Sequence, residues 1–138
     1  MKGYAFRPIG FVKSDIRIPQ SPDNFRNVVA EIVVDECYED ALDGIVEGQW
    51  IVVLFIFHKS NGFSLKVHPR GDTRRALRGL FSTCSPARPN PVGATPVEIL
   101  KVDGRRLAVK GLDAIDGSPV IDIKPFVWKS DSSRERSR

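Results

Sequence analysis

The chain has 138 residues, which is room for one domain, with 41% hydrophobic and 28% charged residues. That composition is ordinary for a soluble globular protein, so a packed core needs no metal or disulfide. Cys37 and Cys84 and the two histidines form no metal-ligand pattern, and we expect no metal. The longest apolar run, residues 50–57, is too short to cross a bilayer, and no signal peptide is visible. We therefore expect a cytoplasmic protein with no membrane contact.

The net charge of +4 is unevenly distributed along the chain. One basic stretch contains Lys66, Arg70, Arg74, Arg75, Arg78 and Arg88, and a second occupies the last ten residues. Clustered positive charge favours a phosphate-bearing partner, whereas a solvated surface with a solubilising tail is the alternative.

The apolar pattern is mostly typical of strands. Residues 4–12 predict an edge or bulged strand because Pro8 and Gly10 interrupt it. Residues 30–34 predict a second strand, and the continuous apolar run 50–57 predicts a strand buried on both faces. Residues 79–83 predict a short fourth strand.

The clearest local signal is Asp103-Gly104, which lies between the apolar runs 97–102 and 105–110. An Asp-Gly pair in this position predicts a two-residue type I′ hairpin, because glycine accepts positive φ. Residues 120–127 predict the last strand. Residues 38–45 predict one short helix, and residues 73–78 could form another turn or two.

Many short strands with tight turns predict a mainly β fold, a small closed or nearly closed β-barrel with one or two short helices. We expect the barrel domain to span residues 1–129. Residues 130–138 contain only Ser, Asp, Glu and Arg, so we expect a disordered basic tail.

No glycine-rich dinucleotide motif, no phosphate-binding P-loop and no alternation of strands with helices is present, so a nucleotide-like cofactor would not be held in the Rossmann manner. The loop of residues 85–93 instead contains three prolines, which stiffen the backbone carrying Arg88 and Asn90. Rigid presentation of polar groups favours binding over a simple stiff connection.

The acidic run 112–119 is ambiguous from composition. Asp113 could bind a ligand, whereas Asp116 could do no more than cap the turn that includes Gly117. Asp122 and Lys124 share one strand face and could form an exposed pair. His58 ends the apolar run 50–57, where it would be either a hydrogen-bonded core-edge residue or a ligand contact at a barrel mouth.

The segments 79–83, 88–93 and 112–125, together with 8–14 and 50–58, resemble in order and spacing the signature blocks of the TsaA-like family. Its characterised members are the TrmO type of tRNA methyltransferase, and the resemblance covers residues 4–127. It implies a homodimeric β-barrel enzyme that binds S-adenosylmethionine near the dimer interface. The implied acceptor is N6-threonylcarbamoyladenosine at position 37 of tRNA, and the product carries an N6-methyl group.

The resemblance also implies where the site lies. The implied cofactor contacts are Ser21, Pro22, Asp23, His58, Lys59, Ala94, Leu112 and Asp113, with Arg88 and Asn90 lining the same pocket. His58 or Asp116 would accept the N6 proton, and the basic face from Arg70 to Arg88 would hold tRNA phosphates. Cys84 departs from the family pattern, which usually has arginine there.

Two other functions fit the sequence. The chain could be a non-catalytic β-barrel module that binds RNA or an adenosyl ligand. It could also be a related methyltransferase with a different acceptor, because acceptor choice depends on the shape of the pocket.

Overall fold

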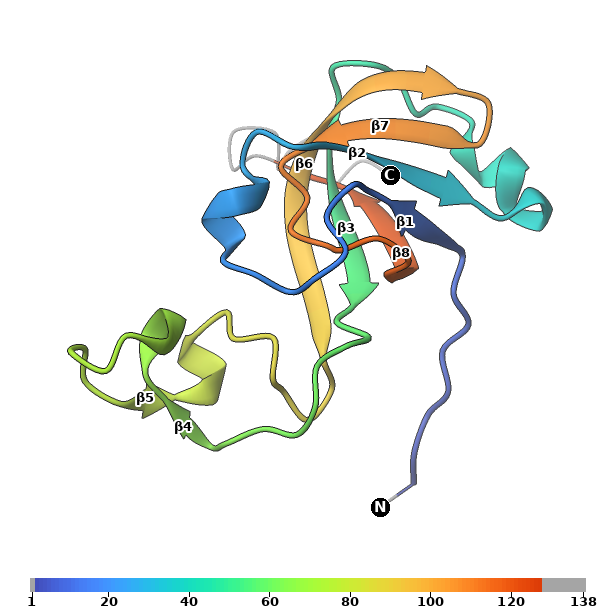
Figure 1. Cartoon of the computed structure of the whole chain (residues 1–138). Helices are drawn as coiled ribbons and strands as arrows, with labels where there is room; N and C mark the ends of the chain where they lie inside the picture. Colours follow the sequence, from blue (N-terminus) through green and yellow to red (C-terminus); the bar gives the residue numbers. More distant parts are fainter. Residues whose placement is uncertain (1, 128–138) are drawn as a thin grey trace.

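The computed structural model describes residues 2–127, so the predicted tail of residues 130–138 lies outside the described residues. Six antiparallel strands close into a barrel in the order β1-β2-β7-β6-β3-β8 (Figure 1). Closure means that every strand has a hydrogen-bonded neighbour on both sides. The predicted fold class is confirmed. The strands are β1 (Gly10–Lys13), β2 (Val29–Val34), β3 (Trp50–Ile56), β6 (Val92–Asp103), β7 (Arg106–Lys110) and β8 (Pro119–Pro125).

The barrel interior is filled by alternate residues of each strand. On β3, Ile51, Val53 and Phe55 have no exposed surface, whereas the residues between them are partly exposed. The prediction that this strand is buried on both faces is therefore wrong. A closed barrel gives each strand one inner face, and β3 reads as continuously apolar because its outward residues are hydrophobic too.

Phe55 and Gly93 form the part of the core nearest the end of β3. These two residues are paired across the β3–β6 ladder. A Cβ atom at Gly93 would lie 2.7 Å from Cε1 of Phe55, so only glycine leaves space for this ring. Phe55 also packs edge-on against Phe57, with the ring centroids 5.0 Å apart. The core thus fixes the position of Phe57 just beyond the strand.

The β6–β7 hairpin is present, but its turn is shifted by one residue from the prediction. Asp103 pairs with Arg106, so the two loop residues are Gly104 and Arg105. Gly104 has φ of +58°, and Arg70 is the one non-glycine residue of 2–127 with positive φ. Positive φ at the first loop position alone fits a type II′ turn and not the predicted type I′.

All the helices in the described part of the chain are short 3-10 helices: η1 (Pro22–Phe25), η2 (Glu36–Leu42), η3 (Pro69–Gly71) and η4 (Leu80–Ser82). The helix predicted at 38–45 begins and ends earlier, as η2, because the Asp35 carboxylate caps the N–H of Cys37. Residues 73–78 form turns and the first residue of β5 instead of a helix. Within residues 2–127, no helix is long and apolar enough to cross a membrane.

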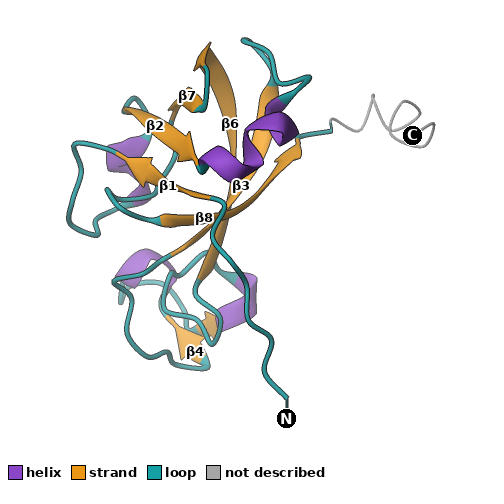
Figure 2. Ribbon diagram, turned by 90° about the vertical axis from the view of Figure 1, so that its right-hand side faces the viewer, coloured by secondary structure: helices purple, strands orange, loops and turns teal. Residues whose placement is uncertain are grey.

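Between β3 and β6 the chain leaves the barrel and forms a separate excursion, residues 58–91, which we call the lobe (Figures 1 and 2). Its two short strands, β4 (Lys66–Val67) and β5 (Arg78–Gly79), pair with each other. The strand predicted at 79–83 is wrong beyond Gly79, since Leu80–Ser82 form η4. The paired residues Ile56 of β3 and Val92 of β6 flank the lobe.

Candidate functional site

The connections β1–β2 and β7–β8 and the start of the lobe meet at one end of the barrel, around a cavity of about 210 Å³. We call it the mouth cavity. Its apolar walls come from Pro19, Pro22, Phe25, Phe57, Pro86 and Ile115. Its main polar groups are Gln20, His58, Lys59 and Asp113. Apolar walls with a few polar groups are typical of small-ligand sites.

Asp113 supplies the one carboxylate among the described residues that line the mouth cavity. The Thr95 hydroxyl, from β6, donates a 2.6 Å hydrogen bond to Oδ1 of Asp113. The neighbours Leu112 and Ala114 are buried in the core, which fixes the backbone on both sides. The barrel therefore holds a negative charge at the edge of an apolar cavity, where it attracts a cation more strongly than in water.

His58 and Lys59 follow β3 directly and form another side of the mouth cavity. His58 is exposed, and its Nε2 atom would lie 3.8 Å from a Cβ placed on Gly117, so the imidazole stands beside the β7–β8 turn. Lys59 Nζ donates a 3.1 Å hydrogen bond to the carbonyl of Arg17. These contacts tie the start of the lobe to the β1–β2 connection.

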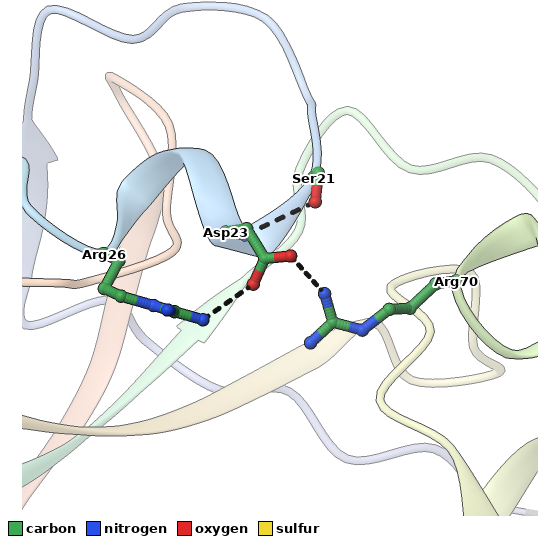
Figure 3. A network of polar contacts seen from close by, with 4 residues as sticks. All are labelled: Ser21, Asp23, Arg26 and Arg70. Carbon is green, nitrogen blue, oxygen red and sulfur yellow. Dashed lines mark hydrogen bonds and ion pairs between the residues drawn. The ribbon is translucent and has the colours of Figure 1, made fainter.

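Of the three β1–β2 residues implied by the resemblance, Pro22 lines the mouth cavity. Ser21 is the N-cap of η1, and its hydroxyl accepts from the N–H of Asp23. Asp23 instead pairs with Arg26 at 3.0 Å and Arg70 at 2.9 Å (Figure 3). This carboxylate therefore links the β1–β2 connection to the lobe.

Arg88 and Asn90 lie on the predicted stiff loop but do not line the mouth cavity. Arg88 Nη1 donates to the carbonyls of Thr83 and Ser85, at 2.9 and 3.0 Å, and its guanidinium lies 5.7 Å from the centroid of the Phe81 ring. The carbonyl of Asn90 accepts from the N–H of Val92. Arg88 thus holds together the segment that contributes Cys84 and Pro86 to the cavity wall.

Ala94, Leu112 and Asp116 also lie outside the lining of the mouth cavity. Ala94 is exposed on β6, and Leu112 is buried in the core. Asp116 Oδ1 accepts the N–H of Ser14 at 2.9 Å, and its own N–H donates to the carbonyl of Ile16. Asp116 therefore fastens the end of β1 to the β7–β8 turn.

A second cavity of about 360 Å³, the lobe cavity, adjoins the mouth cavity and shares Pro22, Cys84 and Pro86 with it. His68, Arg70, Arg75 and Arg78 line it. Cys84, which departs from the family pattern, therefore lies on the wall between the two cavities. No group of three or more possible metal ligands occurs within residues 2–127.

The sequence analysis did not single out several lining residues, among them Phe25, Phe57 and Ile115. It did not single out Thr95 either, which supports Asp113 from behind. Phe25 is almost fully buried and looks like an ordinary core residue in the sequence. The prolines at positions 19 and 22 are a usable signal, because they mark a stiff loop next to the site.

The fold and the site define a small closed β-barrel with a ligand-sized cavity at its mouth. The family model described as the tRNA-methyltransferase O N-terminal domain matches residues 11–132, and the chain belongs to this family. The chain is 44% identical to an S-adenosyl-L-methionine-binding protein of Archaeoglobus fulgidus, over 87% of each chain. It is 45% identical to a probable S-adenosyl-L-methionine-binding protein of Methanothermobacter thermautotrophicus, over 91% of this chain and 92% of that one.

Two further relatives are larger than this chain. A tRNA (adenine(37)-N6)-methyltransferase of Mus musculus is 41% identical over 72% of this chain, which corresponds to 23% of the mouse protein. The crystal structure of TrmO from Pseudomonas aeruginosa matches with a TM-score of 0.73 and 28% identity, over 95% of this chain and 59% of that one. The chain thus spans less than two thirds of the length of the solved structure.

Proposed function

We propose that the protein is an S-adenosylmethionine-dependent methyltransferase that adds a methyl group to N6 of N6-threonylcarbamoyladenosine at position 37 of tRNA. The observation that carries the proposal is the mouth cavity, where Asp113 places a carboxylate among apolar walls. Membership of the tRNA-methyltransferase O family and the names of the relatives support the cofactor and the reaction class. The modified acceptor is taken from the family resemblance.

The residues of the mouth cavity fit this cofactor. When bound, S-adenosylmethionine supplies a methyl group on a positively charged sulfur. Asp113 would attract that positive charge, and the aromatic residues Phe25 and Phe57 line the same cavity, where a cation or a base could pack against them. Phe57 is itself held by Phe55, so its position depends on the barrel core. Little side-chain freedom remains to be lost on binding.

The chain's own contribution to methyl transfer would be alignment and proton removal. Holding the acceptor nitrogen in line with the methyl group can lower the barrier by about 7–11 kcal/mol in favourable cases. We propose His58 as the acceptor of the N6 proton, because it lines the mouth cavity whereas the Asp116 carboxylate is engaged by the N–H of Ser14.

The first experiment tests the cofactor site with Asp113→Asn. The amide oxygen can still accept the Thr95 hydroxyl, so the fold should survive while the negative charge is lost. We expect cofactor affinity, measured by calorimetry, to fall roughly ten-fold or more because the attraction between the carboxylate and the positively charged sulfur is removed. The matched control is Asp103→Asn, an exposed carboxylate at the β6–β7 turn, which should bind as the wild type does. Unchanged affinity in Asp113→Asn would remove this residue from the site.

The second experiment tests catalysis. Labelled cofactor is incubated with tRNA that carries the threonylcarbamoyl group and with the same tRNA lacking it. Methyl incorporation into the first alone is expected, and no incorporation at saturating cofactor would contradict the enzymatic proposal. Cofactor binding without turnover would favour the non-catalytic adenosyl-binding module, and RNA binding with no cofactor affinity would favour the RNA-binding module.

His58→Gln separates proton transfer from binding. Loss of a general base typically lowers the rate by about 10²–10⁴-fold, so we expect kcat to fall by at least ~10². Cofactor affinity is measured on the same variant, because His58 lines the mouth cavity and a loss of affinity without a loss of kcat would indicate a binding role instead. A kcat within a few-fold of wild type would show that the N6 proton leaves by another route.

The resemblance further leads us to propose that the protein is a homodimer and that it works in the cytoplasm. Light scattering over a range of concentrations tests the first point, and a monomer throughout would contradict it. Cell fractionation with an antibody tests the second.

A further inference from the structure

The lobe cavity contains basic side chains and no acidic ones. His68, Arg70, Arg75 and Arg78 line it from the lobe, and Pro22 closes it from η1. Among the described residues that line this cavity, none is Asp or Glu. The mouth cavity, in contrast, carries the Asp113 carboxylate. The mouth cavity also has a cation, Lys59, beside that carboxylate, so of the two cavities only the lobe cavity is lined by cations without a carboxylate.

Two of these arginines, Arg75 and Arg78, differ from the others in their ion pairing. Arg70 is paired with Asp23 at 2.9 Å, and Arg74, which lies outside the cavity, is paired with Asp72 at 2.9 Å. Within residues 2–127, neither Arg75 nor Arg78 forms an ion pair. Hydrogen bonds with Arg74 and the charge of Arg75 lower the pKa of the Asp72 carboxyl, so Asp72 offsets part of the Arg75 charge. The positive charge that remains on this concave wall attracts anions.

The loop that carries Arg70 and Arg75 is held in one shape by its own hydrogen bonds. His68 Nδ1 lies 2.8 Å from the carbonyl oxygen of Arg75, and since a carbonyl only accepts, the imidazole nitrogen donates. The N–H of Gly71 donates to the carbonyl of His68, and that of Arg75 to the carbonyl of Asp72. The guanidinium groups are thus presented from an ordered backbone, which reduces the entropy lost on binding.

The backbone of Arg70 has an unusual conformation. Its φ of +55° is left-handed, a conformation that a non-glycine residue rarely adopts and that clusters at ligand sites. Its side chain reaches across to Asp23 on η1 (Figure 3). Arg70 therefore links the lobe to η1, whose residues Pro22 and Phe25 line the mouth cavity.

The lobe cavity and the mouth cavity share a wall. Pro22, Cys84 and Pro86 line both cavities, so groups bound in the two cavities would be neighbours. Arg88 holds this shared wall through the carbonyls of Thr83 and Ser85.

We propose that the lobe cavity binds an oxyanion of the methyl acceptor through Arg75 and Arg78, and so places the acceptor beside the mouth cavity. The planar guanidinium fork matches a carboxylate or a phosphate with two parallel hydrogen bonds. The identity of the acceptor rests on the proposed function. That acceptor has two oxyanions of this chemistry near N6, the threonyl carboxylate and the backbone phosphates.

The test uses the full chain with two probes. The nucleoside N6-threonylcarbamoyladenosine has the carboxylate but no phosphate, and an unmodified anticodon stem-loop has phosphates but no carboxylate. Their affinities are measured in the wild type, in Arg75→Gln with Arg78→Gln, and in a control, Lys101→Gln with Arg106→Gln. The control makes the same change in net charge at the β6–β7 hairpin, away from the lobe.

We expect the Arg75/Arg78 variant to lose roughly ten-fold or more in affinity for at least one probe. Loss for the nucleoside identifies the carboxylate as the bound group. Loss for the stem-loop, with the slope of log affinity against log salt smaller by about two, identifies a phosphate. The affinity of the Lys101/Arg106 control for the nucleoside should stay within about two-fold of wild type. Its affinity for the stem-loop should fall less than that of the Arg75/Arg78 variant.

The proposal is overturned if the variant binds both probes as the wild type does, if the wild type binds neither, or if the control loses as much as the variant. The single variants Arg75→Gln and Arg78→Gln replace the double variant if its urea midpoint drops. Cofactor affinity and methyl incorporation are measured on the same proteins. If RNA binding depends on Arg75 and Arg78 but no methyl group is transferred, the inference about the lobe cavity stands and the proposed enzymatic activity is rejected. If the variant transfers methyl groups as fast as the wild type at limiting tRNA, the enzymatic activity stands and the inference about the lobe cavity is rejected.

Discussion

The barrel and the lobe differ in how far their hydrophobic side chains are buried. In the barrel, side chains such as Ile32, Phe55 and Leu107 are completely buried. In the lobe, Leu80 and Pro69 are the buried residues, while Phe63, Leu65, Leu77 and Phe81 are at least half exposed. Since burial of apolar area is the main favourable term in folding, the barrel supplies most of the stability.

The residues that stabilise the fold and the residues that line the cavities also lie in different regions. The walls of both cavities come mainly from connections and from the lobe, and the barrel contributes its mouth and the residue Thr95 behind Asp113. A rigid barrel that positions variable loops is a common way to build a site. Changes in the barrel should therefore alter unfolding, and changes in the lobe should alter binding.

The largest expected effect on stability is that of Phe55→Ala. The ring is fully buried, and its loss should lower the free energy of unfolding by about 3–5 kcal/mol, measured by urea denaturation. The counterpart in the lobe is Phe81→Ala. That ring is 80% exposed and contacts Arg88, so its loss should cost at most about 1 kcal/mol. Equal losses would show that the lobe has a buried core of its own in solution.

Gly93→Ala should have an intermediate effect. The added Cβ would lie 2.7 Å from Phe55 Cε1, and overpacking of this kind costs about 1–3 kcal/mol. Gly79→Ala in the lobe is the control, because nothing lies within 4 Å of its Cβ position and its φ of −58° suits alanine. Combining Gly93→Ala with Phe55→Leu should cost less than the sum of the two changes. Strict additivity would mean that the two side chains do not compete for the same space.

The smallest expected effect concerns the ion pair that joins the two regions. Asp23→Asn should lower the free energy of unfolding by no more than about 1 kcal/mol, because the Arg70 and Asp23 side chains are 57% and 54% exposed. The difference from wild type should shrink at high salt, where exposed charges are screened. Arg26→Gln removes the other partner of Asp23 and serves as the comparison. A loss of several kcal/mol in Asp23→Asn would contradict this, and would show that the ion pair is shielded from water in solution.

The sequence predicts the barrel because its signals are local. Alternating apolar residues and tight turns mark the strands, and Gly104 marks the hairpin. The details that depend on register could not be predicted. The pair Asp103-Gly104 and the pair Gly104-Arg105 can each form a two-residue loop, and the choice depends on which residues face the core. In the structure Val109 pairs with Ile99 and Leu107 with Val102, with a register shift between Ile99 and Lys101, and this pairing places the loop at Gly104-Arg105.

For the site, the sequence predicts segments better than side chains. The resemblance points to three connections, and the structure brings Pro22, His58, Lys59 and Asp113 from them together in one cavity. It also points to Ala94 and Leu112, which lie on the outer wall and in the core. Neighbouring residues of a strand or a turn point in different directions, so a motif alone does not say which side chain faces the ligand. Arg88 is a related case, because its rigid loop is visible in the sequence but its two carbonyl partners are not.

The pairing of Ile56 with Val92 has a consequence for how the protein can change. The barrel ladder already holds both ends of residues 58–91 side by side, so a longer or shorter segment could be inserted without moving a strand. Doubling the length of such a segment adds only about 0.6 kcal/mol of closure entropy. The lobe can thus be replaced without rebuilding the barrel, and a short turn in its place should give a minimal barrel on which segments of other length and composition could be grafted.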